Sequence, residues 1–340
     1  MDTMQNVILK IKDLCVKFYT DDGIIPAVRN VSFEIPQQKI ITILGESGSG
    51  KSVTAKAIMN LIVSPGSIER GSILLRDKND KSKWLDILRL KTNSKAIRSI
   101  RWADISMVFQ DPMNSFTPVY TVGNQICEAI MLHRNMTRQQ AKSMAMEYME
   151  KVAMPDPARV FDSYPHQLSG GMSQRAMIAM ALCCQPRIII ADEPTTALDA
   201  TVQIQLLHLL KKTVNQFNTA VLLITHNLGI VAEVADEVIV MYLGKIIEKA
   251  SVEDIFDRPM HPYTAELFAS IPTPQSSADK PLRCIPGTVP NHLNIPKGCP
   301  FFGRCNEQMA ICKDVMPTFE KVDGANHYCA CWLYEMRKNK

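Results

Sequence analysis

The feature that most constrains the fold of this chain is a glycine-rich octapeptide, GESGSGKS, at residues 45–52. It follows a continuous apolar run, IITIL at residues 40–44, which is typical of a strand buried on both faces of a parallel sheet. The residues from about Ser52 to Leu61 then have a composition typical of a helix. A strand, a glycine-rich turn and a helix in this order predict a loop whose backbone N–H groups surround a phosphate, at the positive end of the helix dipole.

The residue types within this loop indicate which phosphates it binds. Lys51 supplies a positive charge toward the β- and γ-phosphates of a nucleotide, and the hydroxyl of Ser52 is suited to bind Mg²⁺. The glycines allow the backbone to turn its N–H groups inward. The predicted nucleotide contacts in this segment are Gly45, Glu46, Ser47, Gly48, Ser49, Gly50, Lys51, Ser52 and Val53.

Short apolar, β-branched runs recur along the chain and are separated by segments of helix length, which is typical of a parallel α/β sheet. These predicted strands are residues 72–75, 105–109, 188–192, 221–225 and 238–242. Two earlier segments, 7–18 and 31–36, alternate apolar and polar residues and predict an antiparallel edge sheet. Residues 112–170 are mainly helical and interrupt the sheet, with Thr137 as a predicted N-cap.

Two acidic residues end one of these strands. Hydrolysis of a nucleotide needs a carboxylate near the metal and a group that orients the attacking water. In the run IIIADE, Asp192 ends the strand and is predicted to hold Mg²⁺ through water, while Glu193 on the following turn is the candidate general base. His226 follows the strand 221–225 and is predicted to donate to the γ-phosphate. Lys51, Glu193 and His226 are therefore candidate catalytic residues.

The bulk composition limits the class of protein. A length of 340 residues predicts about two domains, and a net charge of +4 gives no support to nucleic-acid binding. No apolar run approaches the ~18 residues that span a bilayer, and the N-terminus lacks the layout of a secretory signal. We therefore expect a cytoplasmic chain, in a compartment where disulfides are rare.

The composition changes after about residue 255, where prolines become frequent. Such a density argues against long helices and central strands. Six of the ten cysteines also lie beyond this point: Cys284, Cys299, Cys305, Cys312, Cys329 and Cys331. We therefore predict a nucleotide-binding domain at residues 1–259 and a separate C-terminal extension at residues 260–340.

One motif distinguishes this chain from other proteins with a phosphate loop. LSGGMSQR at residues 168–175 resembles the signature motif of ATP-binding-cassette (ABC) proteins. Ser169, Gly170 and Gly171 are expected to open a helix, so that their N–H groups and hydroxyl form a second anion site. The resemblance implies that these residues and Gln174 contact the nucleotide of a partner subunit, so that two subunits hold ATP between them.

Other segments match further motifs of this family. Gln110, in VFQDP, matches the glutamine that contacts Mg²⁺ and the attacking water, and is a further candidate catalytic residue; Asp199 ends a matching D-loop at 197–199. Phe18 matches the aromatic residue that stacks on adenine, and a shift of one residue would give this role to Tyr19. The resemblance implies a P-loop NTPase (RecA-like) fold of the α/β class, with an antiparallel β subdomain and a helical subdomain, and with ATP and Mg²⁺ as cofactors.

Longer stretches are similar to the ATPases of oligopeptide and dipeptide permeases, a group that also includes importers of nickel and other small solutes. The stretches are 110–126, 192–207, HPYT at 261–264 and IPGTVP at 285–290, together with the cysteine-rich end. The resemblance implies a peripheral ATPase on the cytoplasmic side of the cell membrane that powers peptide import. Its implied partners are two membrane-spanning permease subunits, a second homologous ATPase and an extracellular solute-binding protein. Import of nickel or another small solute is the alternative.

The cysteines of the C-terminal extension are candidates for a metal site. Cys299, Cys305 and Cys312 are followed by a gap and then by Cys329 and Cys331. Four thiolates suit zinc or an iron–sulfur cluster, and the spacing is not that of a zinc ribbon. The resemblance favours a 4Fe–4S cluster with Cys331 as the fourth ligand and Cys329 as the alternative. Reduced free thiols are the remaining interpretation.

Two other functions receive less support from the sequence. ABC ATPases of translation usually carry two cassettes, and those of DNA repair carry long coiled-coil or zinc insertions, whereas this chain has one cassette and no such insertion. A redox sensor, in which the cysteine cluster controls the ATPase, is the third hypothesis.

Overall fold

The computed structural model describes residues 6–111, 115–195, 198–270, 285–322 and 326–338. Contacts divide the chain into two compact units, each assembled from separated segments. Unit 1 consists of Met1–Leu9, Ile35–Ile40 and Leu75–Ile224. Unit 2 consists of Lys10–Glu34, Ile41–Leu74 and Thr225–Lys340.

The strands of unit 1 include a parallel group formed by β6 (Ile105–Val108), β7 (Ile188–Asp192) and β8 (Ala220–Thr225). β7 lies between the other two, because Ile188 pairs with Ile105 on one side and with Ala220 on the other. Every residue of the three strands is buried. Strands covered on both faces need apolar residues at consecutive positions, which explains the unbroken apolar runs from which they were predicted.

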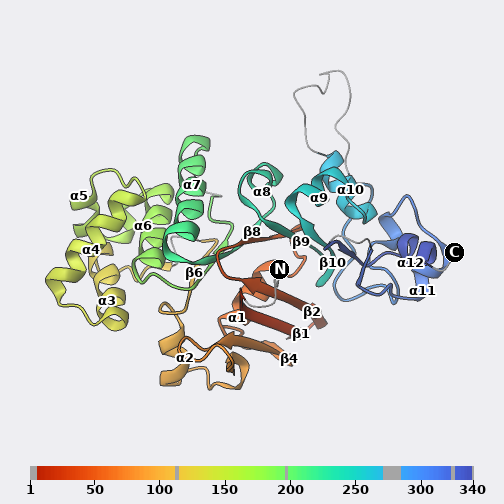
Figure 1. Cartoon of the computed structure of the whole chain (residues 1–340), viewed down its shortest axis with the longest axis horizontal. Coiled ribbons are helices and arrows are strands. Elements are labelled where there is room, and N and C mark those ends of the chain that lie inside the picture. The colour runs from red at the N-terminus through yellow and green to blue at the C-terminus, as the bar shows by residue number, and fades with distance from the viewer. Residues whose placement is uncertain (1–5, 112–114, 196–197, 271–284, 323–325, 339–340) are drawn as a thin grey trace. The chain divides into compact units, whose positions relative to one another are not determined.

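A group of helices packs together in unit 1 (Figure 1). They are α3 (Val122–Arg134), α4 (Arg138–Lys151), α5 (Pro157–Asp162) and α6 (Gly170–Cys183). Thr137 is the N-cap of α4 as predicted, and it forms a capping box with Gln140. The other elements are β5 (Trp84–Asp86), η2 (Ile87–Arg89), α2 (Lys95–Ile100), η4 (Pro165–Gln167) and α7 (Ala200–Phe217).

The strands of one sheet that lie mainly in unit 2 follow the order β2-β1-β4, with β1 at Val7–Thr20, β2 at Gly23–Pro36 and β4 at Gly66–Arg76. The predicted edge strands are confirmed, and the structure extends them. The prediction for 31–36 covers only the second half of β2, because its first half contains Pro26 and alternates less regularly.

The strands of a second sheet that belong to unit 2 follow the order β11-β12-β10-β9-β3. β3 (Ile40–Leu44) is parallel to β9 (Glu237–Tyr242), and β10 (Lys245–Ser251) is antiparallel to β9. β11 (Glu320–Lys321) and β12 (Tyr328–Cys329) extend the sheet beyond β10. β10 was not predicted, because its sequence, KIIEKAS, includes three charged residues and does not alternate regularly between apolar and polar residues.

The helices of unit 2 are all short in the described part of the chain. They are α1 (Lys51–Ile58), α8 (Leu228–Val234), α9 (Val252–Asp257), α10 (Pro262–Ala269), η5 (Phe302–Arg304), α11 (Ala310–Asp314) and α12 (Trp332–Lys338). The proline-rich segment after residue 255 thus has the short elements that its composition predicts. It shares a hydrophobic core with β9 and β10, in which Tyr242, Ile247, Tyr263 and Phe301 are almost fully buried.

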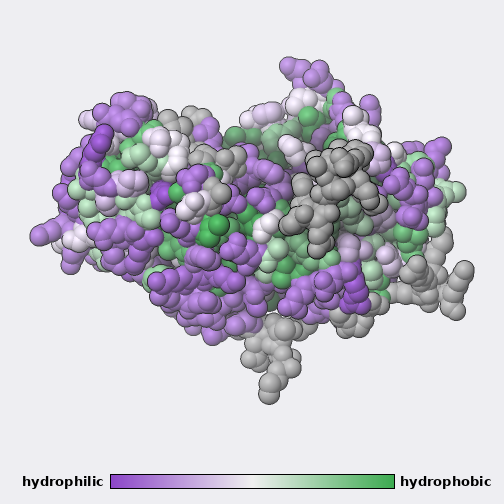
Figure 2. Space-filling model, turned by 90° about the horizontal axis from the view of Figure 1, so that it is seen from above, coloured by the Kyte–Doolittle hydropathy of each residue, from purple (hydrophilic) through white to green (hydrophobic). Residues whose placement is uncertain are grey.

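Among the described residues, no helix is both long and apolar enough to cross a membrane. The face of the molecule in Figure 2 carries mainly hydrophilic residues, with smaller groups of apolar residues between them.

Candidate active site and cysteine pocket

The glycine-rich loop joins β3 to α1, which is the context that the sequence predicts for phosphate binding. Gly45, Gly48 and Gly50 have φ angles of 156°, 78° and 96°, in the region that favours glycine. A Cβ atom on Gly50 would lie 2.4 Å from the carbonyl oxygen of Ala27, so no larger side chain fits there. Gly50 is also the N-cap of α1. The helix therefore opens directly from the loop, with its free N–H groups at the position expected for phosphate.

The side chain of Lys51 lies inside this loop. The side chain is almost fully buried, and its ammonium group donates to the carbonyl oxygens of Gly45 and Glu46, each at 2.8 Å. A further contact joins it to the hydroxyl of Ser49 at 3.4 Å. These bonds hold the ammonium group against the loop backbone, where it can meet a phosphate oxygen.

Two residues that the sequence analysis missed also contact the loop. The backbone N–H of Glu46 donates to the hydroxyl of Tyr263 at 3.0 Å. The carboxylate of Glu46 accepts two hydrogen bonds from the guanidinium of Arg304, at 2.7 and 3.1 Å. The HPYT segment carries only a family resemblance, and no local pattern marks Arg304, because its partner lies 258 positions away.

The candidate metal ligand and base lie in unit 1, at the end of β7. Asp192 is almost fully buried and pairs with Ile224 of β8. Glu193 has a φ angle of 49°, and its backbone N–H donates to the carbonyl oxygen of Ile224 at 2.9 Å. Gln110, after β6, donates from Nε2 to Oε2 of Glu193 at 3.2 Å. The structure thus places Gln110 next to Glu193. Two residues that are predicted to act on the same water molecule need to be neighbours in this way.

The signature segment forms the N-terminus of α6. Ser169 is its N-cap, and its hydroxyl accepts from the N–H of Met172 at 3.3 Å. Gly170 and Gly171 are the first residues of the helix, so their N–H groups have no partner within it. Gln174 is fully buried, and its amide has no hydrogen-bond partner among the described residues. In the present structure its side chain is therefore closed to a ligand.

The remaining predicted nucleotide contacts lie at the ends of other elements. Asp199 is the N-cap of α7 and accepts from the N–H of Val202 at 3.0 Å, while residue 197 of the same motif lies outside the described residues. Phe18, near the end of β1, is half-buried against Gly66, whereas Tyr19 is 47% exposed. His226 is exposed, directly after β8.

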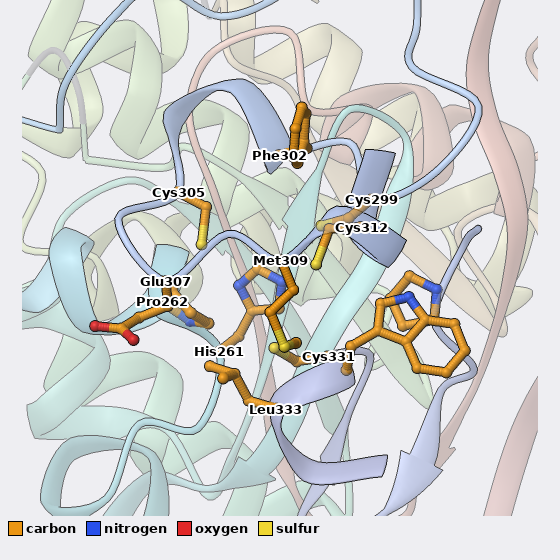
Figure 3. Close-up of a pocket in the computed structure, with 12 residues that line it drawn as sticks. His261, Pro262, Cys299, Phe302, Cys305, Glu307, Met309, Cys312, Cys331 and Leu333 are labelled. Carbon is orange, nitrogen blue, oxygen red and sulfur yellow. The ribbon is translucent and has the colours of Figure 1, made fainter. Parts of the chain in front are cut away.

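Four cysteines line one cavity in unit 2 (Figure 3). They are Cys299, Cys305, Cys312 and Cys331, the first choice of ligands in the sequence analysis. They come from three segments: the turn around η5, α11 and the residue before α12. Backbone hydrogen bonds join two of these segments, since the N–H of Cys299 donates to the carbonyl oxygen of Cys312 at 2.8 Å.

Cys329 does not line this cavity. It lies in β12, where it pairs with Glu248 of β10 and with Glu320 of β11. Cys284, the other cysteine of this region, lies outside the described residues. Burial raises the pKa of Cys299 to about 11 and that of Cys331 to about 12, so a metal that binds these thiols must displace their protons. Within the described residues, no group of three or more His, Cys, Asp and Glu side chains is arranged to hold a single metal ion.

Comparison with known proteins identifies the family. Residues 28–196 match the family model described as ABC transporter. Residues 247–312 match the model described as oligopeptide/dipeptide transporter, C-terminal region. The chain is 44% identical over 331 residues to the dipeptide transport ATP-binding protein DppD of Bacillus subtilis (strain 168), which covers 97% of this chain and 96% of that protein. This chain belongs to the oligopeptide/dipeptide branch of the ABC transporter ATP-binding proteins.

Other relatives and structures agree with this assignment. The oligopeptide transport ATP-binding protein OppD of the same organism is 44% identical over 327 residues, covering 96% of this chain and 88% of that protein. The dimeric structure of the ATP-binding cassette MJ0796, bound to ADP and Pi, has a TM-score of 0.64 and 27% identity, and covers 72% of this chain and 99% of that one. The predicted ABC fold is thereby confirmed, and the chain is an ABC-type ATPase, whose family uses ATP and Mg²⁺.

Proposed function

We propose that this ATPase powers the import of oligopeptides or dipeptides by an ABC transporter. The observation that carries the proposal is similarity along nearly the whole chain to transport ATP-binding proteins for dipeptides and oligopeptides. The match at 247–312 supports it further, because the matching family model is described as the C-terminal region of oligopeptide/dipeptide transporters. Import of nickel or another small solute is the alternative and is not favoured by these relatives.

The test of the substrate is an uptake assay in cells that lack this chain. Uptake of a radiolabelled dipeptide and of radiolabelled Ni²⁺ is measured in the deletion strain, and again after the wild-type chain or Lys51→Ala is supplied. The proposal expects loss of peptide uptake, restored by the wild-type chain and not by Lys51→Ala. Loss of Ni²⁺ uptake with normal peptide uptake would establish the alternative.

The roles that we propose for individual residues in hydrolysis follow from their residue types and from the motifs in which they occur. The loop at 45–52 and Lys51 bind the phosphates, Ser52 and Asp192 hold Mg²⁺, and Glu193 activates water that Gln110 helps to orient. The hydrogen bond from Gln110 to Glu193 supports the last pair of roles. His226 donates to the γ-phosphate, and Phe18 stacks on adenine. Ser169, Gly170, Gly171 and Asp199 act on the nucleotide bound to a partner subunit, whereas the buried side chain of Gln174, predicted for the same role, does not reach a ligand in this structure.

The proposed assembly follows from the position of the signature residues. An exposed helix N-terminus at Ser169 supports an anion site that a second nucleotide-binding subunit completes. We therefore propose a pair of homologous ATPases on the cytoplasmic side of the membrane, bound to two membrane-spanning permease subunits, with an extracellular solute-binding protein in the full complex. The division into a nucleotide-binding domain, 1–259, and an extension, 260–340, remains part of this proposal.

We also propose a 4Fe–4S cluster in the cysteine pocket. Four thiols around one cavity match the ligand set of such a cluster, and the arrangement leaves out Cys329. Cys299, Cys305, Cys312 and Cys331 would hold it as thiolates. Such a cluster would supply cross-links between segments that have little regular structure of their own.

A further inference from the structure

The C-terminal segment after residue 260 contacts the phosphate loop at Glu46. Both groups belong to unit 2. Arg304 forms a two-bond ion pair with the carboxylate of Glu46, and the hydroxyl of Tyr263 accepts from its backbone N–H. Side chain and backbone of the same loop residue are thus held by residues more than 200 positions away.

The side chain of Arg304 is buried and makes hydrogen bonds on several sides. The residue is 8% exposed, Nε donates to the carbonyl oxygen of Pro286 at 2.9 Å, and Nη1 donates to the hydroxyl of Tyr242 at 3.2 Å. Burial by itself would lower the pKa of Arg304, but the bonds to Glu46 and Tyr242 outweigh it and raise the pKa. A planar guanidinium with a bidentate carboxylate partner fixes orientation as well as charge.

Tyr263 is also buried and packed on several sides. Its ring is fully buried and packs against those of Tyr242 and Phe301, with centroids 4.7 and 5.4 Å away. Its backbone N–H donates to Nδ1 of His261, the N-cap of α10. The N–H of His261 in turn donates to the fully buried carboxylate of Glu248 at 2.9 Å. The HPYT motif therefore places one hydroxyl against the phosphate loop.

The position of Glu46 matters for the lysine of the loop. The ammonium group of Lys51 donates to the carbonyl oxygen of Glu46, so a movement of Glu46 also displaces the ammonium group. A loop fixed before the nucleotide arrives loses less conformational entropy on binding, which strengthens affinity. Displacing the loop should therefore weaken ATP binding more than it slows the chemical step.

We infer that Arg304 and Tyr263 are positioning residues for ATP, which act through Glu46 and make nucleotide affinity depend on the folded C-terminal segment. Arg304 precedes Cys305, a residue of the cysteine pocket, so the same turn serves both sites. The inference rests on the proposed role of the loop in binding the phosphates.

The test is a double-mutant cycle in the full-length chain. Arg304→Met, Glu46→Gln and the double variant are compared by the Kd of a fluorescent ATP analogue, and by KM and kcat in the assembled transporter. Loss of the ion pair is expected to raise Kd and KM about tenfold, the change that ~1.4 kcal/mol produces, with kcat within about threefold. Because Arg304 acts through Glu46, the double variant should bind no more weakly than either single one.

Two further variants separate positioning from general stability. Tyr263→Phe removes only the hydroxyl and should also raise Kd, whereas Arg258→Gln, which removes an exposed ion pair with Asp254 in the same unit, should leave Kd unchanged. Wild-type affinity in both Arg304→Met and Tyr263→Phe would overturn the inference, as would additive losses in the cycle. If the wild-type chain itself binds no ATP, or Lys51→Ala binds it equally well, the proposed role of the loop fails instead.

Discussion

At the scale of single residues, Glu193 combines the features expected of a general base. It follows a buried strand, adopts a left-handed φ angle of 49°, and accepts a hydrogen bond from Gln110. The charged carboxylate is needed for proton transfer but not for binding the nucleotide, so Glu193→Gln should keep ATP affinity and reduce the steady-state ATPase rate by about 100-fold or more. The rate is measured by phosphate release and the affinity by nucleotide titration. Turnover at the wild-type rate would refute the assignment of the base.

The two neighbouring cysteines provide a matched pair of variants at the same scale. Cys331 lines the pocket with three other cysteines, whereas Cys329 belongs to a strand pair. We expect protein purified without oxygen to be brown, with about four irons per chain as a 4Fe–4S cluster requires. Cys331→Ser should lose iron and colour, and Cys329→Ser should keep both.

Other metal contents would decide between the remaining interpretations of the cysteines. Stoichiometric zinc without iron would make the site structural zinc, and a chain with neither metal and an ordered C-terminal segment would leave buried free thiols.

At the scale of elements, the N-terminus of α6 has a structural and a proposed functional role that a matched helix can separate. Ser169 caps α6 and Thr137 caps α4, in the same packed group of helices. Replacing either by Ala should lower the free energy of unfolding by about 1 kcal/mol, because a helix N–H loses its acceptor. Only Ser169→Ala should also reduce the ATPase rate of the assembled transporter, since Thr137 has no proposed nucleotide contact. Denaturant unfolding and phosphate release measure the two effects. Equal activity of both variants would show that Ser169 is only a cap.

At the scale of the whole molecule, the proposed active site is incomplete in one chain. The signature residues serve a partner's nucleotide in this proposal, so the isolated chain should hydrolyse ATP at a small fraction of the rate of the assembled transporter. Adding the homologous second ATPase and the membrane subunits should restore the rate. Phosphate release at equal chain concentration provides the comparison. An isolated monomer as active as the complex would contradict the shared-site mechanism for this protein.

Local patterns in the sequence determined most of the elements. A strand, GESGSGKS and a helix in register are sufficient for the phosphate loop, because backbone geometry and helix dipole act over a few residues. Apolar runs located β3, β6, β7, β8 and β9 within about one residue, and Thr137 located the start of α4. In each case the interactions that fix the element lie inside the segment itself or on faces buried along its whole length.

Only the tertiary structure decided which distant segments meet. β10 carries a weak local pattern and is stabilised by its neighbours β9 and β12, so the sequence did not reveal it. Counting residues could not show which of Cys331 and Cys329 lies with the other three cysteines. In the structure, Cys331 lines the pocket and Cys329 does not. The pair of Arg304 and Glu46 joins residues 258 positions apart. Such contacts depend on how strands and turns pack in three dimensions, and hydrophobic periodicity along the chain does not predict them.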